Sequence, residues 1–156
     1  MVKFAAPLKS MAGMLLIQAG LGHLSERMLE GDLKEEPIVA LGGVTPRRLM
    51  ETLGTDWGRK LIDPGVWVKV TEARLRALLE GGTSVVVDDV RFANEFALIK
   101  RLGGSMVHIE RPDTVPTAME NRLSAETFDH YLSNDGAQAE FTAKVDRLAT
   151  RLRGAR

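Results

Sequence analysis

Apolar residues recur at roughly helical spacing over residues 8–29, with a break expected at Gly20 to Gly22. The residues that mark this pattern are Met11, Leu15, Ala19, Leu24 and Met28. The spacing predicts two helices or one bent helix. Ahead of it, residues 2–6 form a short apolar segment that Pro7 ends, and this segment is expected to be a strand or the end of one.

The middle of the chain predicts two further helices. Thr45 stands directly before Pro46, a pairing of N-cap residue and first helical position that starts a helix. Leu49, Leu53 and Trp57 supply one apolar face for it. Residues 66–79 alternate apolar and charged positions as an amphipathic helix does, and two glycines end that helix at 81–82.

Strand signals dominate the region that follows. Residues 85–87 are three consecutive valines, which is typical of a strand buried on both faces of a parallel sheet. Residues 94–102 predict a helix and residues 106–109 a second strand, so together they form a βαβ unit. Residues 130–132 are expected to be a short third strand, with a terminal helix after the Asn134-Asp135-Gly136 turn. The fold class predicted is α/β.

Composition narrows the class of protein. A chain of 156 residues supports one domain, expected to span 1–156. Its 21 basic and 21 acidic residues cancel, which disfavours nucleic acid as a partner. There is no cysteine, which excludes thiolate metal sites and fits a cytoplasmic location. The apolar stretch at residues 11–21 is too short to span a membrane, for which ~20 residues are needed.

Charged residues follow the valine run, where ligands of open parallel sheets bind. Asp88 or Asp89 could hold a hydrated magnesium ion or orient a hydroxyl, and Arg91 could grip a phosphate with two parallel hydrogen bonds. The alternative is structural. In it, one aspartate caps the next helix and Arg91 pairs with Glu95.

Arg47 and Arg48 lie at the N-terminus of the helix that Thr45 caps. Two cations oppose the helix dipole there, so an anionic ligand would relieve a cost. The alternative is an ordinary solvated pair of arginines, whose cost is only ~0.3–1 kcal/mol.

The run Gly54-Thr55-Asp56-Trp57-Gly58-Arg59 combines two glycines, an indole and a guanidinium. That composition suits close backbone approach to a flat or phosphorylated ligand. The alternative is a plain helix end with Trp57 in the core.

Four motifs together resemble the deoxynucleoside monophosphate kinases of tailed bacteriophages, in order and spacing as well as content. They are Phe4-Ala5-Ala6-Pro7-Leu8-Lys9, Gly42-Gly43-Val44-Thr45-Pro46-Arg47, Leu53-Gly54-Thr55-Asp56-Trp57-Gly58-Arg59 and Val87-Asp88-Asp89-Val90-Arg91-Phe92-Ala93-Asn94-Glu95. The likeness continues through Leu102-Gly103-Gly104, Glu110-Arg111-Pro112 and residues 129–136, so it covers nearly the whole chain.

The resemblance implies a three-layer parallel sheet of the P-loop nucleoside monophosphate kinase type, which transfers a phosphoryl group from ATP to a deoxynucleoside monophosphate with Mg²⁺. It implies a monophosphate-binding part at about residues 30–80 and a lid at about 111–127. The residues that it implies for the substrate are Thr45, Arg47, Thr55, Trp57, Arg59 and Glu95. It further implies Asp89, Arg91 and Arg111 as catalytic residues, Asp88 as a metal ligand, and Asn134, Asp135 and Gly136 beside the adenine of ATP.

The resemblance also implies a Gly-x-x-x-x-Gly-Lys-Ser/Thr loop and a first, central strand, and no Gly-Lys-Ser or Gly-Lys-Thr occurs in this sequence. We therefore expect a kinase homologue that is active if a P-loop is supplied by residues outside this sequence. The alternative is a non-catalytic nucleotide-binding or protein-interaction module. The oligomeric state stays open, with a homodimer as one alternative.

Overall fold

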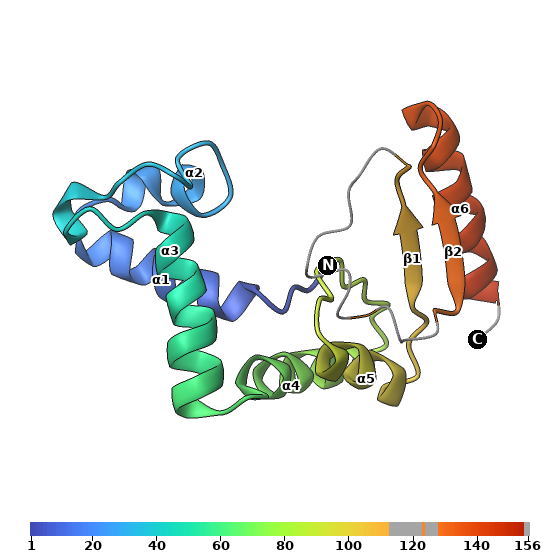
Figure 1. The fold of residues 1–156 in the computed structure, drawn as a ribbon. Coiled ribbons are helices and arrows are strands. Elements are labelled where there is room, and N and C mark those ends of the chain that lie inside the picture. The colour runs from blue at the N-terminus through green and yellow to red at the C-terminus, as the bar shows by residue number, and fades with distance from the viewer. Residues whose placement is uncertain (113–122, 124–127, 155–156) are drawn as a thin grey trace. The chain divides into compact units, whose positions relative to one another are not determined.

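The computed structural model describes residues 1–112, 123 and 128–154. The chain divides into two compact units, Met1–Val90 and Arg91–Arg156, and each is described by itself. Helices and a parallel pair of strands make up these units, as an α/β chain requires (Figure 1). The expected single domain and the three-layer sheet stay predictions.

The first unit is mostly helical. Its elements are α1 (Ala6–Gln18), the 3₁₀ turn η1 (Gly22–Leu24), α2 (Ser25–Leu29), the 3₁₀ turn η2 (Val39–Leu41), α3 (Pro46–Glu51), the π-helix η3 (Thr52–Ile62) and α4 (Val66–Glu80). The predicted pair of helices over residues 8–29 is confirmed. Gly20 separates them with φ 77°, a backbone conformation that glycine adopts without a steric cost.

One apolar cluster holds the first unit together. Ala12 and Leu16 of α1 are fully buried and pack with Met28, Leu29 and Ile38. Partly buried leucines of the loop before α3, of α3 and of η3 close over this cluster. Side chains of the sequence region that precedes α3 thereby fix the position of α3, where the first group of candidate residues lies.

The start of α3 follows the sequence prediction. Thr45 has extended backbone and its Oγ1 accepts a hydrogen bond from the Arg48 N–H at 3.2 Å, while Pro46 stands at the first helical position. In Figure 1, α3 runs directly into η3, which carries the helix through to Ile62. The wider π-helical turn was not predicted.

The second unit contains α5 (Ala93–Arg101), β1 (Val107–Glu110), β2 (His130–Ser133) and α6 (Gln138–Gly154). These four elements confirm the predicted helices and the strands at residues 106–109 and 130–132. The two strands are parallel, with Val107 opposite His130 and Glu110 opposite Ser133. Phe96 of α5 packs edge-on against Phe128 at 5.4 Å between ring centroids.

The predicted strand at residues 85–87 is wrong as a strand buried on both faces. Val87 forms a single parallel bridge with Val2, and Val86 is 65% exposed. A segment with one short backbone partner has one edge and much of its surface open to solvent, whatever its β propensity. Residues 2–6 likewise contribute only that bridge. The predicted βαβ arrangement includes residues of both compact units, so it stays a prediction.

Most of the expected lid, about residues 111–127, lies outside the described residues. Within the part of the chain that the structure describes, no helix combines the length and apolar character needed to cross a bilayer.

Candidate functional site

Arg47 is held against the loop that precedes α3. Its Nε donates a hydrogen bond to the Glu35 carboxylate and its backbone N–H donates to the Lys34 carbonyl at 2.9 Å. Glu35 raises the pKa of Arg47, first through that hydrogen bond and then through its charge. The carboxylate of Glu35 therefore offsets part of the cost of a cation at this helix N-terminus. More than half of the Arg47 side chain remains exposed to solvent.

η3 carries Thr55, Trp57 and Arg59. Thr55 is exposed, and Trp57 is 38% exposed with its ring centroid 6.3 Å from that of Trp67. The buried indole is therefore Trp67, whose Nε1 donates to the Gly54 carbonyl at 2.8 Å. Arg59 is partly buried and its Nη1 also donates to that carbonyl, at 3.4 Å. The alternative in which Trp57 fills the core is wrong, because more than a third of its surface is exposed to solvent.

Asp88 and Asp89 differ sharply in their surroundings. Asp88 is exposed and lies 3.6 Å from Lys3. Asp89 instead receives the Phe4 and Ala5 N–H groups, one on each carboxylate oxygen, both at 2.9 Å. It therefore supports the start of α1, and not of the next helix as the structural alternative held. A carboxylate has about four acceptor positions, so these two bonds leave it capacity for further donors.

Glu95 organises the start of α5. Its side chain is only 2% exposed, and Oε2 accepts hydrogen bonds from the Arg91 N–H at 2.8 Å and the Phe92 N–H at 3.2 Å. A carboxylate in this place satisfies N–H groups that have no partner within the helix and favours the helix dipole. Glu95 thus fixes the backbone of Arg91, one of the predicted catalytic residues.

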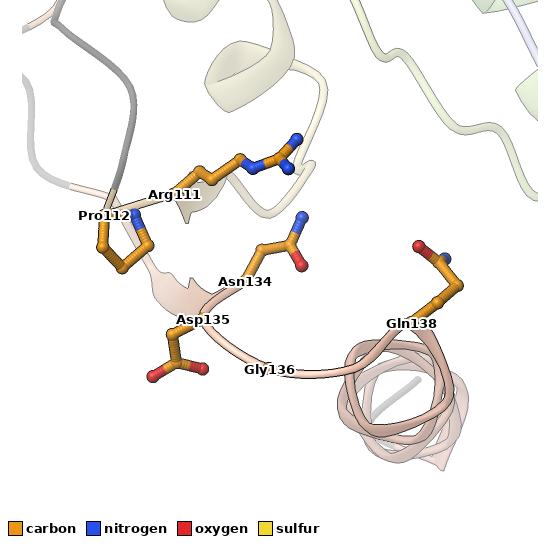
Figure 2. Close-up of a pocket in the computed structure, with 6 residues that line it drawn as sticks. All are labelled: Arg111, Pro112, Asn134, Asp135, Gly136 and Gln138. Carbon is orange, nitrogen blue, oxygen red and sulfur yellow. The ribbon is translucent and has the colours of Figure 1, made fainter.

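A pocket of about 490 Å³ brings together Arg111 and all three residues predicted to lie beside adenine. Its lining residues are Arg111, Pro112, Asn134, Asp135, Gly136 and Gln138. Figure 2 shows the Arg111 and Asn134 side chains on the same side of the loop, with Gln138 projecting from the first turn of α6. The Asn134 N–H donates to the Glu110 carbonyl at 2.7 Å, which extends the β1–β2 pairing to this loop.

Asp135 points away from the Arg111 side of the pocket in Figure 2. A hydrogen bond from the Ser133 side chain, and a second from Lys144, lower the pKa of Asp135 to about 2. The Lys144 Nζ lies 2.9 Å from the Asp135 carboxylate and 2.8 Å from the Ser133 carbonyl. Asp135 is therefore ionised at neutral pH, and Lys144 anchors the loop to α6.

Pro112, Gln138 and Lys144 were missed by sequence reasoning. Gln138 could have been found, because it begins the helix that follows the Asn-Asp-Gly turn and a helix N-terminus faces the preceding loop. Lys144 lies further along the same helix, and nothing in the local sequence indicates which of its residues face the loop. Its contact depends on three-dimensional packing.

The chemistry of this pocket suits a nucleotide base. Amide groups of Asn134 and Gln138 can both donate and accept, and a guanidinium plane can stack on an aromatic ring.

A metal ion held by protein side chains alone fits less well, since the described residues contain no group of three or more His, Asp or Glu side chains able to hold an ion. Magnesium in phosphoryl-transfer sites usually keeps several waters and binds through one or two carboxylates and the phosphates.

Comparison with known proteins decides the family. The family model described as Deoxynucleotide monophosphate kinase matches residues 36–145, more than half of the chain. The chain belongs to the deoxynucleotide monophosphate kinase family. A putative deoxynucleotide monophosphate kinase of Acanthamoeba polyphaga mimivirus is 32% identical over 91% of this chain and 78% of its own length.

Two bacteriophage relatives match over shorter regions. The deoxynucleotide monophosphate kinase of Escherichia phage RB69 is 30% identical over 65% of this chain and 43% of its own length. The deoxynucleoside-5'-monophosphate kinase of Escherichia phage T5 is 28% identical over 50% of this chain and 30% of its own length. No solved structure matches the chain. The resemblance to this kinase family that the sequence motifs predicted is confirmed.

Proposed function

We propose that this chain is the nucleotide-binding part of a kinase that transfers the γ-phosphoryl group of ATP to a deoxynucleoside 5'-monophosphate. Membership of the deoxynucleotide monophosphate kinase family is the observation that carries the proposal. The phosphate cradle and its lysine would come from residues outside this sequence. The alternative, a non-catalytic nucleotide-binding or protein-interaction module, has no specific observation in its favour.

The first unit would bind the monophosphate. Thr45 and Arg47 at the start of α3, and Thr55, Trp57 and Arg59 on η3, are the residues assigned to it. The guanidinium of Arg59 is preorganised by its contact with the Gly54 carbonyl, and the partly exposed ring of Trp57 offers an apolar surface to the sugar or base. Preorganisation lowers the entropy lost when the substrate is positioned.

Asp89 and Arg91 would be catalytic residues, and Glu95 would contribute to the substrate site. Phosphoryl transfer depends mostly on positioning and charge neutralisation, and it needs no nucleophile from the protein because the substrate phosphate supplies the attacking oxygen. Arg91 would neutralise phosphate charge, while Glu95 positions it by fixing its backbone. Asp88 would hold magnesium through water, and the ion when bound would reduce the charge of the phosphates.

The second unit would bind the ATP base. Asn134, Asp135 and Gly136 contribute the loop, Arg111 its guanidinium, and Gln138 an additional amide. The pocket of about 490 Å³ lies within the range of small-molecule sites. Ser133 and Lys144, through Asp135, would keep the loop in place over the neutral pH range.

The test combines calorimetric titration with a coupled kinase assay, using dAMP, dGMP, dTMP and ATP with magnesium. The proposal expects binding of ATP and at least one monophosphate, and formation of the diphosphate when the phosphate cradle is present. Binding of a monophosphate without ATP binding would support the non-catalytic module instead. Binding of neither nucleotide would contradict the kinase and the nucleotide-binding module, and would leave only a protein-interaction module.

A variant and a matched control test whether Arg91 binds the monophosphate. Arg91→Ala should weaken monophosphate binding by about 1.5–3 kcal/mol, the worth of a hydrogen bond to a charged group. Lys60→Ala serves as the control, because Lys60 is exposed on η3 and pairs with Asp56. Unchanged monophosphate affinity in Arg91→Ala would remove Arg91 from the site.

A further inference from the structure

A second pocket of about 380 Å³ lies between β2 and α6. Residues 129–132 line one side of it, and Lys144, Arg147, Leu148 and Arg151 line the other. The α6 residues follow one another at helical spacing, so they form a single stripe on the helix. Of the lining residues only Lys144 also contacts the loop assigned to the ATP base, through Ser133 and Asp135.

The strand contributes its edge to this pocket. Consecutive side chains of a strand point to opposite faces, so a pocket that touches consecutive residues of β2 lies along the edge of the strand and not on one face. The opposite edge of β2 pairs with β1, and among the described residues β1 is its one strand neighbour. In Figure 1, α6 runs alongside β2 on the side away from β1. The pocket therefore borders backbone N–H and C=O groups outside the described ladder.

The stripe on α6 makes this edge cationic. Lys144, Arg147 and Arg151 are its three cations, whereas Asp129 is the one carboxylate in the lining. Asp129 is already engaged, because it receives the Lys100 Nζ and the Met106 N–H, each at 2.6 Å. Lys144 in turn pairs with Asp135 at 2.9 Å, so the positive charge of the groove rests mainly on Arg147 and Arg151.

We propose that this groove binds an acidic peptide segment in extended conformation, which adds a strand to the edge of β2 that does not pair with β1. Backbone hydrogen bonds to the edge would give affinity, and carboxylates of alternate residues would pair with Arg147 and Arg151. The same charges argue against a second copy of this chain as occupant, since two β2 edges brought together would also bring together two cationic stripes.

The experiment measures fluorescence anisotropy of a labelled peptide of about eight residues, in which glutamate alternates with valine or threonine to favour a strand. The full chain should bind this peptide in a salt-sensitive manner. Charge reversal in Arg147→Glu and Arg151→Glu should each weaken binding roughly tenfold or more, the equivalent of about 1.4 kcal/mol. Arg153→Glu is the control, because Arg153 is a cation of the same helix that does not line the groove.

Two further probes separate a strand partner from a small anion. The same peptide with an N-methyl group on every amide keeps its charge but has no N–H group left to donate to a strand edge, so it should bind much more weakly. Inorganic pyrophosphate should not displace the labelled peptide at matched ionic strength. Absence of peptide binding, equal binding of the N-methylated peptide, an equal loss in Arg153→Glu, or displacement by pyrophosphate would each overturn the proposal. Circular dichroism of the variants verifies that they are folded.

Discussion

Gly58 is required by the close approach of one tryptophan. A Cβ at this position would lie 2.6 Å from Cζ2 of the buried Trp67 ring, which is far inside van der Waals contact. We expect Gly58→Ala to lower the free energy of unfolding by about 1–3 kcal/mol, because the indole or the helix must shift. Urea denaturation followed by tryptophan fluorescence measures this loss.

Gly54→Ala is the matched control in the same π-helix. A Cβ on Gly54 would lie 3.4 Å from a methyl group of Leu8, an ordinary contact distance. Its effect should be clearly smaller than that of Gly58→Ala. Equal losses in the two variants would show that the π-helix resists any added side chain, and that the contact with Trp67 is not the cause.

The two adjacent aspartates should differ in their structural importance. Asp89→Ala removes the acceptor of two backbone N–H groups at the start of α1, and an N–H left without a partner costs about 1–3 kcal/mol. Asp88→Ala removes only an exposed ion pair with Lys3, worth about 0–1 kcal/mol. Chemical denaturation of both variants should show a larger loss for Asp89→Ala. The reverse order would contradict the described contacts.

At the scale of the elements, α4 carries a buried hydroxyl that lacks a hydrogen bond within the described structure. Thr71 is 2% exposed, and its Oγ1 has no partner there. Thr71→Val replaces this hydroxyl by a methyl group of similar size, so it should leave stability unchanged or raise it by up to about 1 kcal/mol. Thermal unfolding measured by circular dichroism gives the change.

Thr71→Ser provides the comparison because it keeps the hydroxyl and removes the methyl group. Loss of one buried methyl group should lower the free energy of unfolding by about 0.8 kcal/mol or more. If the serine variant were the more stable of the two, the hydroxyl would have a hydrogen-bond partner that the described contacts do not contain.

Asp129 links the start of β2 to α5 and makes the second unit sensitive to acid. The Lys100 hydrogen bond, and then the Met106 N–H, lower the pKa of Asp129 below 3.8. A carboxylate whose pKa is lower in the folded state contributes stability that is complete above its unfolded pKa and is lost as the pH falls through the folded pKa. We therefore expect the urea midpoint of the wild type to fall as the pH drops through and below the ordinary titration range of an aspartate carboxyl.

Asp129→Asn removes this titration. The variant should be less stable than the wild type at neutral pH and should lose less stability on acidification, because one fewer carboxylate must be protonated. Urea midpoints at several pH values measure both effects. An identical pH dependence of wild type and variant would exclude Asp129 as a contributor.

At the scale of the whole molecule, the sequence predicted those features that depend only on residues close together in the chain. Thr45 and Pro46 start α3 as expected because an N-cap depends on neighbouring residues only. The strand at residues 85–87 could not be judged from its valines, since burial depends on which segments lie beside it. The π-helix could not be predicted for the same reason, because it occurs together with a packing contact between Gly58 and the Trp67 ring.

The candidate site shows the same difference: the sequence indicated which residues belong to it, but not which hydrogen bonds they make. Asn134, Asp135, Gly136 and Arg111 were predicted from family resemblance, and the structure brings them to one pocket. Asp89 and Glu95 were predicted by the same route, and both carboxylates accept hydrogen bonds from backbone N–H groups at helix starts. Sequence motifs locate a residue along the chain, whereas its hydrogen-bond partners depend on the packing of distant segments.

The amide NMR spectrum of the isotope-labelled chain can show directly which residues bind each nucleotide. We predict that a deoxynucleoside monophosphate perturbs the amides of residues 45–59, and that ATP perturbs Arg111, Asn134 and Gly136. Perturbations confined to other regions, or no perturbation by either nucleotide, would contradict the assignment of these residues to nucleotide binding.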